Sequence, residues 1–311
     1  MSSTHVACGN FLLAARGHRR RDRVRPRLVF ASSHAHAHAH EEGKQTSLKK
    51  GLAFQALSGA YVLLAASTCV APGAQLSLSV PSIVQATTAH ALGDASTHGR
   101  LGSDTYKRLC AGLTASSVVT LVVAATTPSP AGLALPALVA AYSCAACTAA
   151  YKAELLAVMP SLTPLLWCVA TAKNLAAKSY AVFAAATTAA AIALVATPQW
   201  VLASTGLAGT AVTASASTIA VARCLGAALF TNGVALYCLA DAADRSRLGG
   251  STFKHLNGAC AAAATLAGAL LVVAANSATF DGSLMSLALL QITPASVCLF
   301  QYLTASKSKK G

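Results

Sequence analysis

Lysine and arginine occur at one end of every long apolar stretch in this chain and are missing from the other end. The turns at the other end are short, and their only charged residue is Asp281. Polytopic helical membrane proteins show this asymmetry, because their basic loops stay on the side from which the chain is inserted. The basic loops are residues 44–50, 100–108, 152–178, 245–254 and 307–310, and the intervening turns are residues 71–74, 127–130, 197–199 and 276–282.

The composition indicates that lipid surrounds most of the chain. Only 10% of the 311 residues are charged and 55% are hydrophobic, whereas a soluble domain carries about 25% charged residues. The net charge of +14 comes from residues 1–31 and from the basic loops, so it predicts no nucleic-acid partner. The expected partners are the lipid bilayer and other membrane proteins.

The apolar stretches predict an all-α, polytopic membrane protein with about eight spans, since a span needs roughly 20 apolar residues. Both termini then lie on the basic side, and the transmembrane helical domain covers residues 51–305. Soft boundaries in the Ala-rich stretches leave the count between about seven and nine. The spans pair as four helical hairpins, which are residues 51–71 with 75–92, 109–126 with 131–151, 179–197 with a helix inside 200–242, and 255–276 with 283–305.

Two of these hairpins share sequence motifs that predict an internal repeat. The second begins with TYKRL at residues 105–109, and the fourth begins with TFKHL at residues 252–256. Their first helices end in the same pentapeptide, LVVAA, at residues 121–125 and 271–275. Aromatic and basic side chains at such positions favour the headgroup level. The sequence therefore predicts six interface anchors, which are Tyr106, Lys107, Arg108, Phe253, Lys254 and His255.

Three segments fit this scheme less well. Residues 75–92 are rich in Ser, Thr and Gln around a proline, which is typical of an interfacial or re-entrant segment. Residues 155–172 contain two prolines and have lysines near both ends, so we expect them to lie along the basic face. Residues 200–242 are too long for one span, and we expect a polar entry followed by a helix from about residue 219.

The N-terminus has the composition of an organelle transit peptide. Residues 1–31 hold seven arginines and one acid, without the apolar segment of a secretory signal. Residues 29–31, Val-Phe-Ala, resemble the Val-x-Ala cleavage pattern of chloroplast transit peptides. The resemblance implies a plastid membrane, the inner envelope or thylakoid, with the mitochondrial inner membrane as the alternative. We further predict a disordered His/Ala-rich linker at residues 32–50 and a basic tail at residues 306–311.

Arg223 is the candidate substrate-binding residue, because charged side chains inside spans are costly and often functional. It can bind an anionic substrate or pair with Asp241 or Glu154. The simpler alternative is that the helix begins close by and Arg223 reaches the headgroups by snorkelling.

Other chemistry-bearing residues give weaker signals. Cys144 and Cys147 share a helix face but lack further ligands, so two small buried residues are the simpler interpretation. His90, His98 and His255 show no spacing typical of haem or chlorophyll ligation. We predict no catalytic residue, metal ion or cofactor.

The pattern favours a non-enzymatic integral membrane protein with an assembly, scaffold or complex-associated role. Small-residue helices with almost no intramembrane charge suit packing more than catalysis. The alternative is a carrier for a small anion or metabolite, built from repeated hairpins, with Arg223 on the path. A weaker third option is a membrane-embedded enzyme acting on a lipid or isoprenoid.

Overall fold

A computed structural model describes residues 29–70, 78–128, 130–151, 165, 167–204, 215–277, 296–301 and 303–304. The chain divides into two units, residues 1–43 and 44–311. Every described element is a helix. The predicted transit peptide, the second helix of the fourth hairpin and the basic tail lie largely or wholly outside the described residues.

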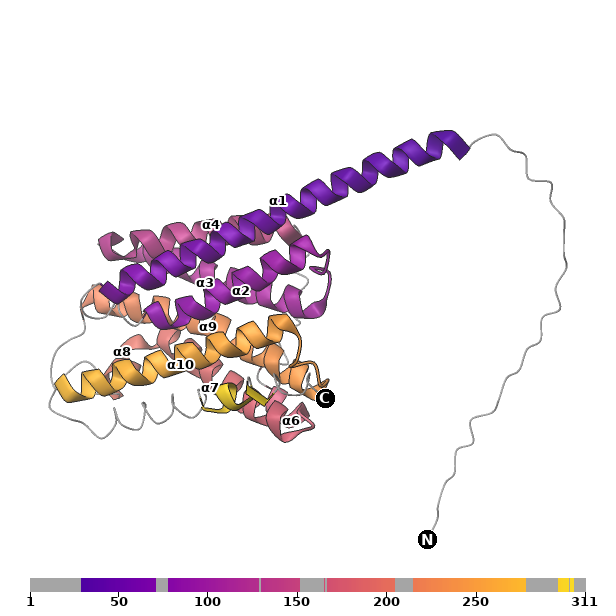
Figure 1. The fold of residues 1–311 in the computed structure, drawn as a ribbon. Coiled ribbons are helices and arrows are strands. Elements are labelled where there is room, and N and C mark those ends of the chain that lie inside the picture. Colours follow the sequence, from indigo (N-terminus) through magenta and orange to yellow (C-terminus); the bar gives the residue numbers. More distant parts are fainter. Residues whose placement is uncertain are drawn as a thin grey trace, which may run out of the picture. The chain divides into compact units, whose positions relative to one another are not determined.

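The second unit is a bundle in which the long helices run side by side (Figure 1). Short helices lie at the turns between them. The long helices are α1 (Val29–Val70), of which residues 44–70 belong to this unit, α2 (Ser79–Thr97), α3 (Asp104–Thr126), α4 (Ala134–Tyr151), α7 (Leu175–Ala196), α9 (Ala216–Asp244) and α10 (Ser251–Ser277). The short helices are η2 (Pro130–Leu133), α6 (Cys168–Thr171) and α8 (Pro198–Ser204).

Polar residues begin two of these helices by capping free backbone amides. The Asn174 side chain accepts a hydrogen bond of 2.7 Å from the Ala177 amide at the start of α7. The Ser215 hydroxyl accepts one of 3.2 Å from the Thr218 amide at the start of α9. Gly99 follows α2 with a φ of 65°, a left-handed conformation that glycine adopts without steric cost.

Among the described residues, five helices are long and apolar enough to cross a membrane. In α9, 72% of the apolar window is buried inside the protein, against 28% in α1. The bundle therefore has a central helix and a peripheral one. The five segments are Gln45–Cys69, Asp104–Thr126, Ala134–Tyr151, Leu175–Ala196 and Ala216–Asp244.

The polar segment at residues 75–92, which the sequence describes as interfacial or re-entrant, contains most of a buried helix in the structure. Most residues of α2 are buried, and this helix contacts α3, α9 and α10. It also packs on α1, because a Cβ on Gly93 would lie 3.3 Å from the backbone oxygen of Gly51. The polar side chains of α2 are satisfied inside the bundle, for example by the Gln85 to Ser116 hydrogen bond.

The most extensive helix contact joins α7 to α9 through small residues. A Cβ on Gly226 would lie 2.8 Å from the Ala191 carbonyl oxygen, and one on Gly233 would collide with the Thr188 hydroxyl. Small residues allow helix backbones to approach this closely, which is a common mode of association in membranes.

The structure describes parts of two further segments singled out in the sequence. Helix α1 includes residues 32–50, for which composition predicts a disordered His/Ala-rich linker, and the alanines of this segment favour a helix. Of residues 155–172, only the end is described. There Leu165 is buried, and α6 packs on α7.

Candidate polar cavity and charged end of the bundle

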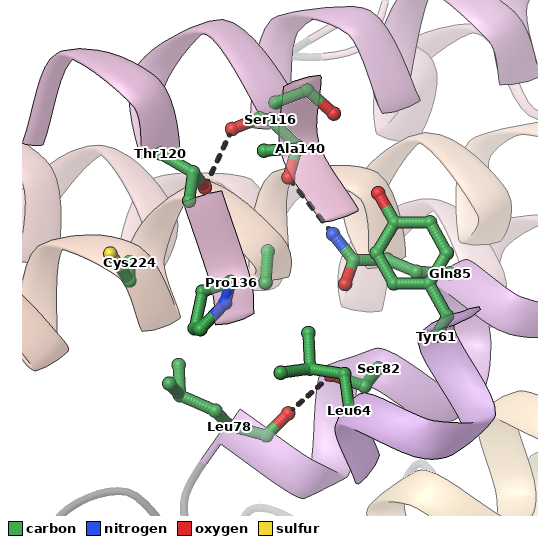
Figure 2. A pocket seen from close by; sticks show the side chains of 12 residues that line it. Tyr61, Leu64, Leu78, Ser82, Gln85, Ser116, Thr120, Pro136, Ala140 and Cys224 are labelled. Atoms are coloured by element: carbon green, nitrogen blue, oxygen red, sulfur yellow. Dashed lines mark hydrogen bonds between the residues drawn. The ribbon is translucent and has the colours of Figure 1, made fainter. Parts of the chain in front are cut away.

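A cavity of about 30 Å³ lies inside the bundle where α1, α2, α3, α4 and α9 meet (Figure 2). One side is apolar and the other carries hydroxyl groups and a carboxamide. The lining residues are Tyr61, Leu64, Leu78, Ser82, Gln85, Ser116, Ser117, Thr120, Pro136, Ala140, Cys224 and Ala228.

Hydrogen bonds hold most polar groups around this cavity in place. The Gln85 Nε2 donates to Ser116 Oγ at 3.0 Å, which joins α2 to α3. The hydroxyls of Ser82 and Thr120 donate to backbone oxygens one turn earlier, at 2.7 Å and 2.9 Å. Figure 2 shows Gln85 directed toward Ser116, with the Tyr61 ring beside it.

Buried hydroxyls without a hydrogen bond of normal geometry occur at Ser117, which lines the cavity, and at Thr88 of α2 and Ser143 of α4, which do not. The Tyr61 phenol interacts with Ser117 and Ser143, but the geometry of neither contact meets the criteria for a hydrogen bond. A buried hydroxyl without a partner is costly, and a cavity of this size accommodates water. The cavity thus supplies neutral donors and acceptors in the middle of the bundle.

The lining carries no charged side chain. No group of three or more His, Cys, Asp or Glu that could hold a metal ion occurs among the described residues. The arrangement is suited to binding water or a very small neutral molecule and to fixing the rotation of the five helices. General acid or base catalysis requires a positioned titratable group with an accessible proton, and the cavity offers only the Tyr61 phenol and the Cys224 thiol.

Arg223 lies on α9 next to the cavity-lining Cys224 but does not line the cavity itself. Its Nε is buried without a hydrogen-bond partner. Arg223 and Asp241 are 18 residues apart on one helix, which corresponds to about 27 Å. A hydrocarbon core is about 30 Å thick, so the two charges are separated by nearly the length of a span. This spacing fits a boundary position for Arg223 if Asp241 lies at the opposite headgroup level, and it rules out a direct pair with Asp241.

Two of the six predicted interface anchors point into the protein. Tyr106 is buried, and its hydroxyl lies 2.9 Å from Thr252 Oγ1, so the first residues of α3 contact those of α10. Arg108 keeps only 15% of its side chain exposed and lies over the Tyr237 ring at 5.1 Å. The remaining four lie nearer the surface: Lys107, Phe253 and Lys254 are half-buried, and His255 is exposed.

Arg108 belongs to a charged cluster at the end of α9. One Asp241 oxygen lies 3.7 Å from Arg108 Nη1, and the other lies 2.9 Å from Arg245 Nη2. Nearby, Asp244 accepts a 2.9 Å hydrogen bond from the Lys173 amide, which ties the start of α7 to the end of α9. Carboxylates of α9 therefore organise the basic end of the bundle. Basic residues at the ends of spans usually face the headgroups, so the sequence does not indicate this role.

The cysteines in the described residues are all free thiols. Cys147 is buried and interacts with Cys110 of α3, whereas Cys144 is half-buried. The spacing of Cys144 and Cys147 therefore does not produce a paired site. Burial also raises the pKa of the Cys168 thiol outside the spans, which keeps this group protonated and poorly reactive at neutral pH.

Comparisons with protein-family models, with curated proteins and with solved structures find no match to this chain.

Proposed function

We propose that this chain is a multi-pass organelle membrane protein with a non-enzymatic role in assembling or scaffolding membrane complexes. The observation that carries the proposal is the close filling of the bundle by small residues. Gly226 and Gly233 let α9 approach α7 to backbone contact, and the polar cavity measures only about 30 Å³. A rigid, filled bundle suits a protein that presents its outer surface to lipid and to other membrane proteins.

The outer surface supports the same proposal. Large apolar side chains face away from the bundle on four different helices, as expected for contact with lipid tails or partner helices. Examples are Leu52 and Leu63 of α1, Val122 of α3, Leu138 of α4 and Ile192 of α7, which are between 52% and 69% exposed.

The proposed topology has about eight spans in four hairpins, with the second and fourth related by an internal repeat. Its support is the basic residues at one end of each span and the repeated motifs at residues 105–109 and 252–256. The proposed location is the plastid inner envelope or thylakoid, with the mitochondrial inner membrane as the alternative. This rests on the Arg-rich residues 1–31.

Site-specific photo-crosslinking in isolated organelles tests the scaffold role. A photoreactive residue replaces Leu63, Leu138 or Ile192 in turn, and each of these side chains faces outward. We expect at least one position to crosslink to another protein, because a scaffold must touch partners within the membrane. Leu113 is fully buried, so the same substitution there should give no such product. Crosslinks to lipid alone at all three outward positions would contradict the proposal.

A carrier for a small anion or metabolite is the second candidate. One observation favours it: the hydroxyl-lined cavity reaches Cys224, the sequence neighbour of Arg223, and the Arg223 Nε is buried without a hydrogen-bond partner. Under this alternative, Arg223 lines the path of the substrate.

Uptake of candidate anions into reconstituted vesicles separates the two functions. We expect the wild-type protein and Arg223→Ala to give the same uptake, because under the scaffold proposal Arg223 lies at a membrane boundary, 18 residues from Asp241 on α9. Arg245→Ala, at the opposite end of α9 and half-exposed, serves as the matched control. Loss of uptake in Arg223→Ala alone would favour the carrier.

A further inference from the structure

Two histidines that are 165 positions apart in sequence lie together on the outside of the bundle. His90 belongs to α2 and His255 to α10, and these helices pack against each other. Their ring centroids are 6.1 Å apart, with the ring planes tilted by 56°. Both residues are exposed. Helix packing, and not a flexible loop, therefore holds the two imidazoles at this separation.

The separation is one that a shared metal ion allows. An ion bound to one nitrogen of each ring at about 2.0–2.1 Å places the two ring centres roughly 4.5–6.4 Å apart, depending on the nitrogen–metal–nitrogen angle. The observed 6.1 Å lies inside that interval, toward its wide-angle end. Edge-to-face packing of aromatic rings covers a similar distance, so ring packing alone is the alternative that an experiment must exclude.

Neither ring is engaged elsewhere. In the part of the chain that the structure describes, the His90 and His255 nitrogens take part in no hydrogen bond or ion pair, and each ring contacts the other. His98 differs, because its Nδ1 lies 2.8 Å from the Asp94 carbonyl oxygen and 3.2 Å from the Asp94 carboxylate. His98 thus serves as the control histidine: it is exposed like the other two, but its Nδ1 already contacts Asp94.

We propose that His90 and His255 bind one divalent transition-metal ion, zinc or copper, which bridges α2 and α10. Imidazole nitrogens suit both ions. No third His, Cys, Asp or Glu completes a ligand set among the described residues, so water fills the other coordination positions. Such an open site differs from the closed four-ligand sites of structural zinc. The ion is therefore exchangeable, and it reaches the site from the side of the basic loops, since His255 follows Lys254.

Binding should strengthen the contact between α2 and α10. A ligand that binds the folded state and not the unfolded state raises the melting temperature in proportion to the logarithm of its concentration. Acidification should oppose the effect, because protons compete with the metal for the imidazole nitrogens. The proposal is independent of the scaffold or carrier function.

The test uses the full chain in detergent, in a background where the six remaining N-terminal histidines are replaced by glutamine so that only folded-domain sites bind. Zinc and Cu²⁺ are titrated in competition with a chromophoric chelator, and the melting temperature is followed in parallel. We expect one ion per chain and a rise in melting temperature. The replaced residues are His5, His18, His34, His36, His38 and His40.

In this background, His90→Ala and His255→Ala should each weaken binding at least about tenfold, since even outer partners of metal ligands contribute that much. His98→Ala should bind as the background does. The electron paramagnetic resonance spectrum of the Cu²⁺ form should show coupling to two nitrogens. Equal affinity in all three variants, or coupling to a single nitrogen, would show that the rings only pack. Melting of the metal-free variants at the background temperature confirms that they fold.

Discussion

Replacing Gly226 by leucine should lower the free energy of unfolding by at least about 3 kcal/mol, the upper part of the range for overpacked interiors. The reason is backbone proximity. Even a single Cβ at this position would lie 2.8 Å from both the Ala191 carbonyl oxygen and the Leu194 Cβ. A carbonyl inside a helix cannot rotate away, so α7 and α9 must separate along their whole contact.

Thermal unfolding and SDS titration in mixed micelles measure this effect. Gly59 is the matched control, because nothing lies within 4 Å of a Cβ built there, and Gly59→Leu should unfold like the wild type. Gly233→Ala offers a second check. It meets the Thr188 hydroxyl, a side-chain group, so adding Thr188→Ala should restore most of the loss. If Gly59→Leu and Gly226→Leu lower the free energy of unfolding equally, the result would contradict the observed α7–α9 packing.

The second large effect is expected for Asp241→Ala, which should lower the free energy of unfolding by about 2–3 kcal/mol. Removing one partner of a fully buried ion pair costs about 3–5 kcal/mol because the other charge remains desolvated. The expected cost is lower here, since Asp241 is 25% exposed and lies 3.7 Å from Arg108. The Arg108 side chain is only 15% exposed, so its guanidinium would keep Tyr237 as a neighbour but lose its carboxylate.

The matched control is Asp94→Ala, whose partner Arg100 is 48% exposed. Exposed pairs contribute at most about 1 kcal/mol, so this variant should unfold close to the wild type. The double variant Arg108→Leu with Asp241→Leu should recover stability relative to Asp241→Ala, because no buried charge is then left unpaired. If the two single Asp variants lose the same stability, the Arg108 contact does not contribute as described.

Sequence patterning predicts the helices of this protein well where apolar periodicity and charge agree. The second hairpin is expected at residues 109–126 and 131–151, and the structure has α3 at Asp104–Thr126 and α4 at Ala134–Tyr151. Charges mark these ends because lysine and arginine avoid the hydrocarbon core. The positions of the spans in a real bilayer, the full span count and the repeat remain predictions.

Patterning does not reveal the burial of α2, because its polar residues carry no sign of an internal partner. Gln85 is 5% exposed and pairs with Ser116, which is 31 residues away. A polar residue can be internal when another helix supplies its partner, and neither helix alone shows which rotation brings the two together. The same limit hides the proximity of His90 to His255 and the inward direction of Arg108, since each depends on a helix far away in sequence.

If the two charges of α9 lie at opposite headgroup levels, they also set the bilayer thickness that suits this protein. Arg223 and Asp241 leave about 27 Å of helix between them, somewhat less than an average hydrocarbon core of about 30 Å. A thicker bilayer would either pull Arg223 below the headgroups or thin locally around the bundle, each at a cost that grows with every ångström of mismatch. Tilting relieves only an excess of helix length and cannot correct this shortfall. With the two charges at the boundaries, we expect the protein to be enriched in thin membranes and depleted from thicker, sterol-rich ones.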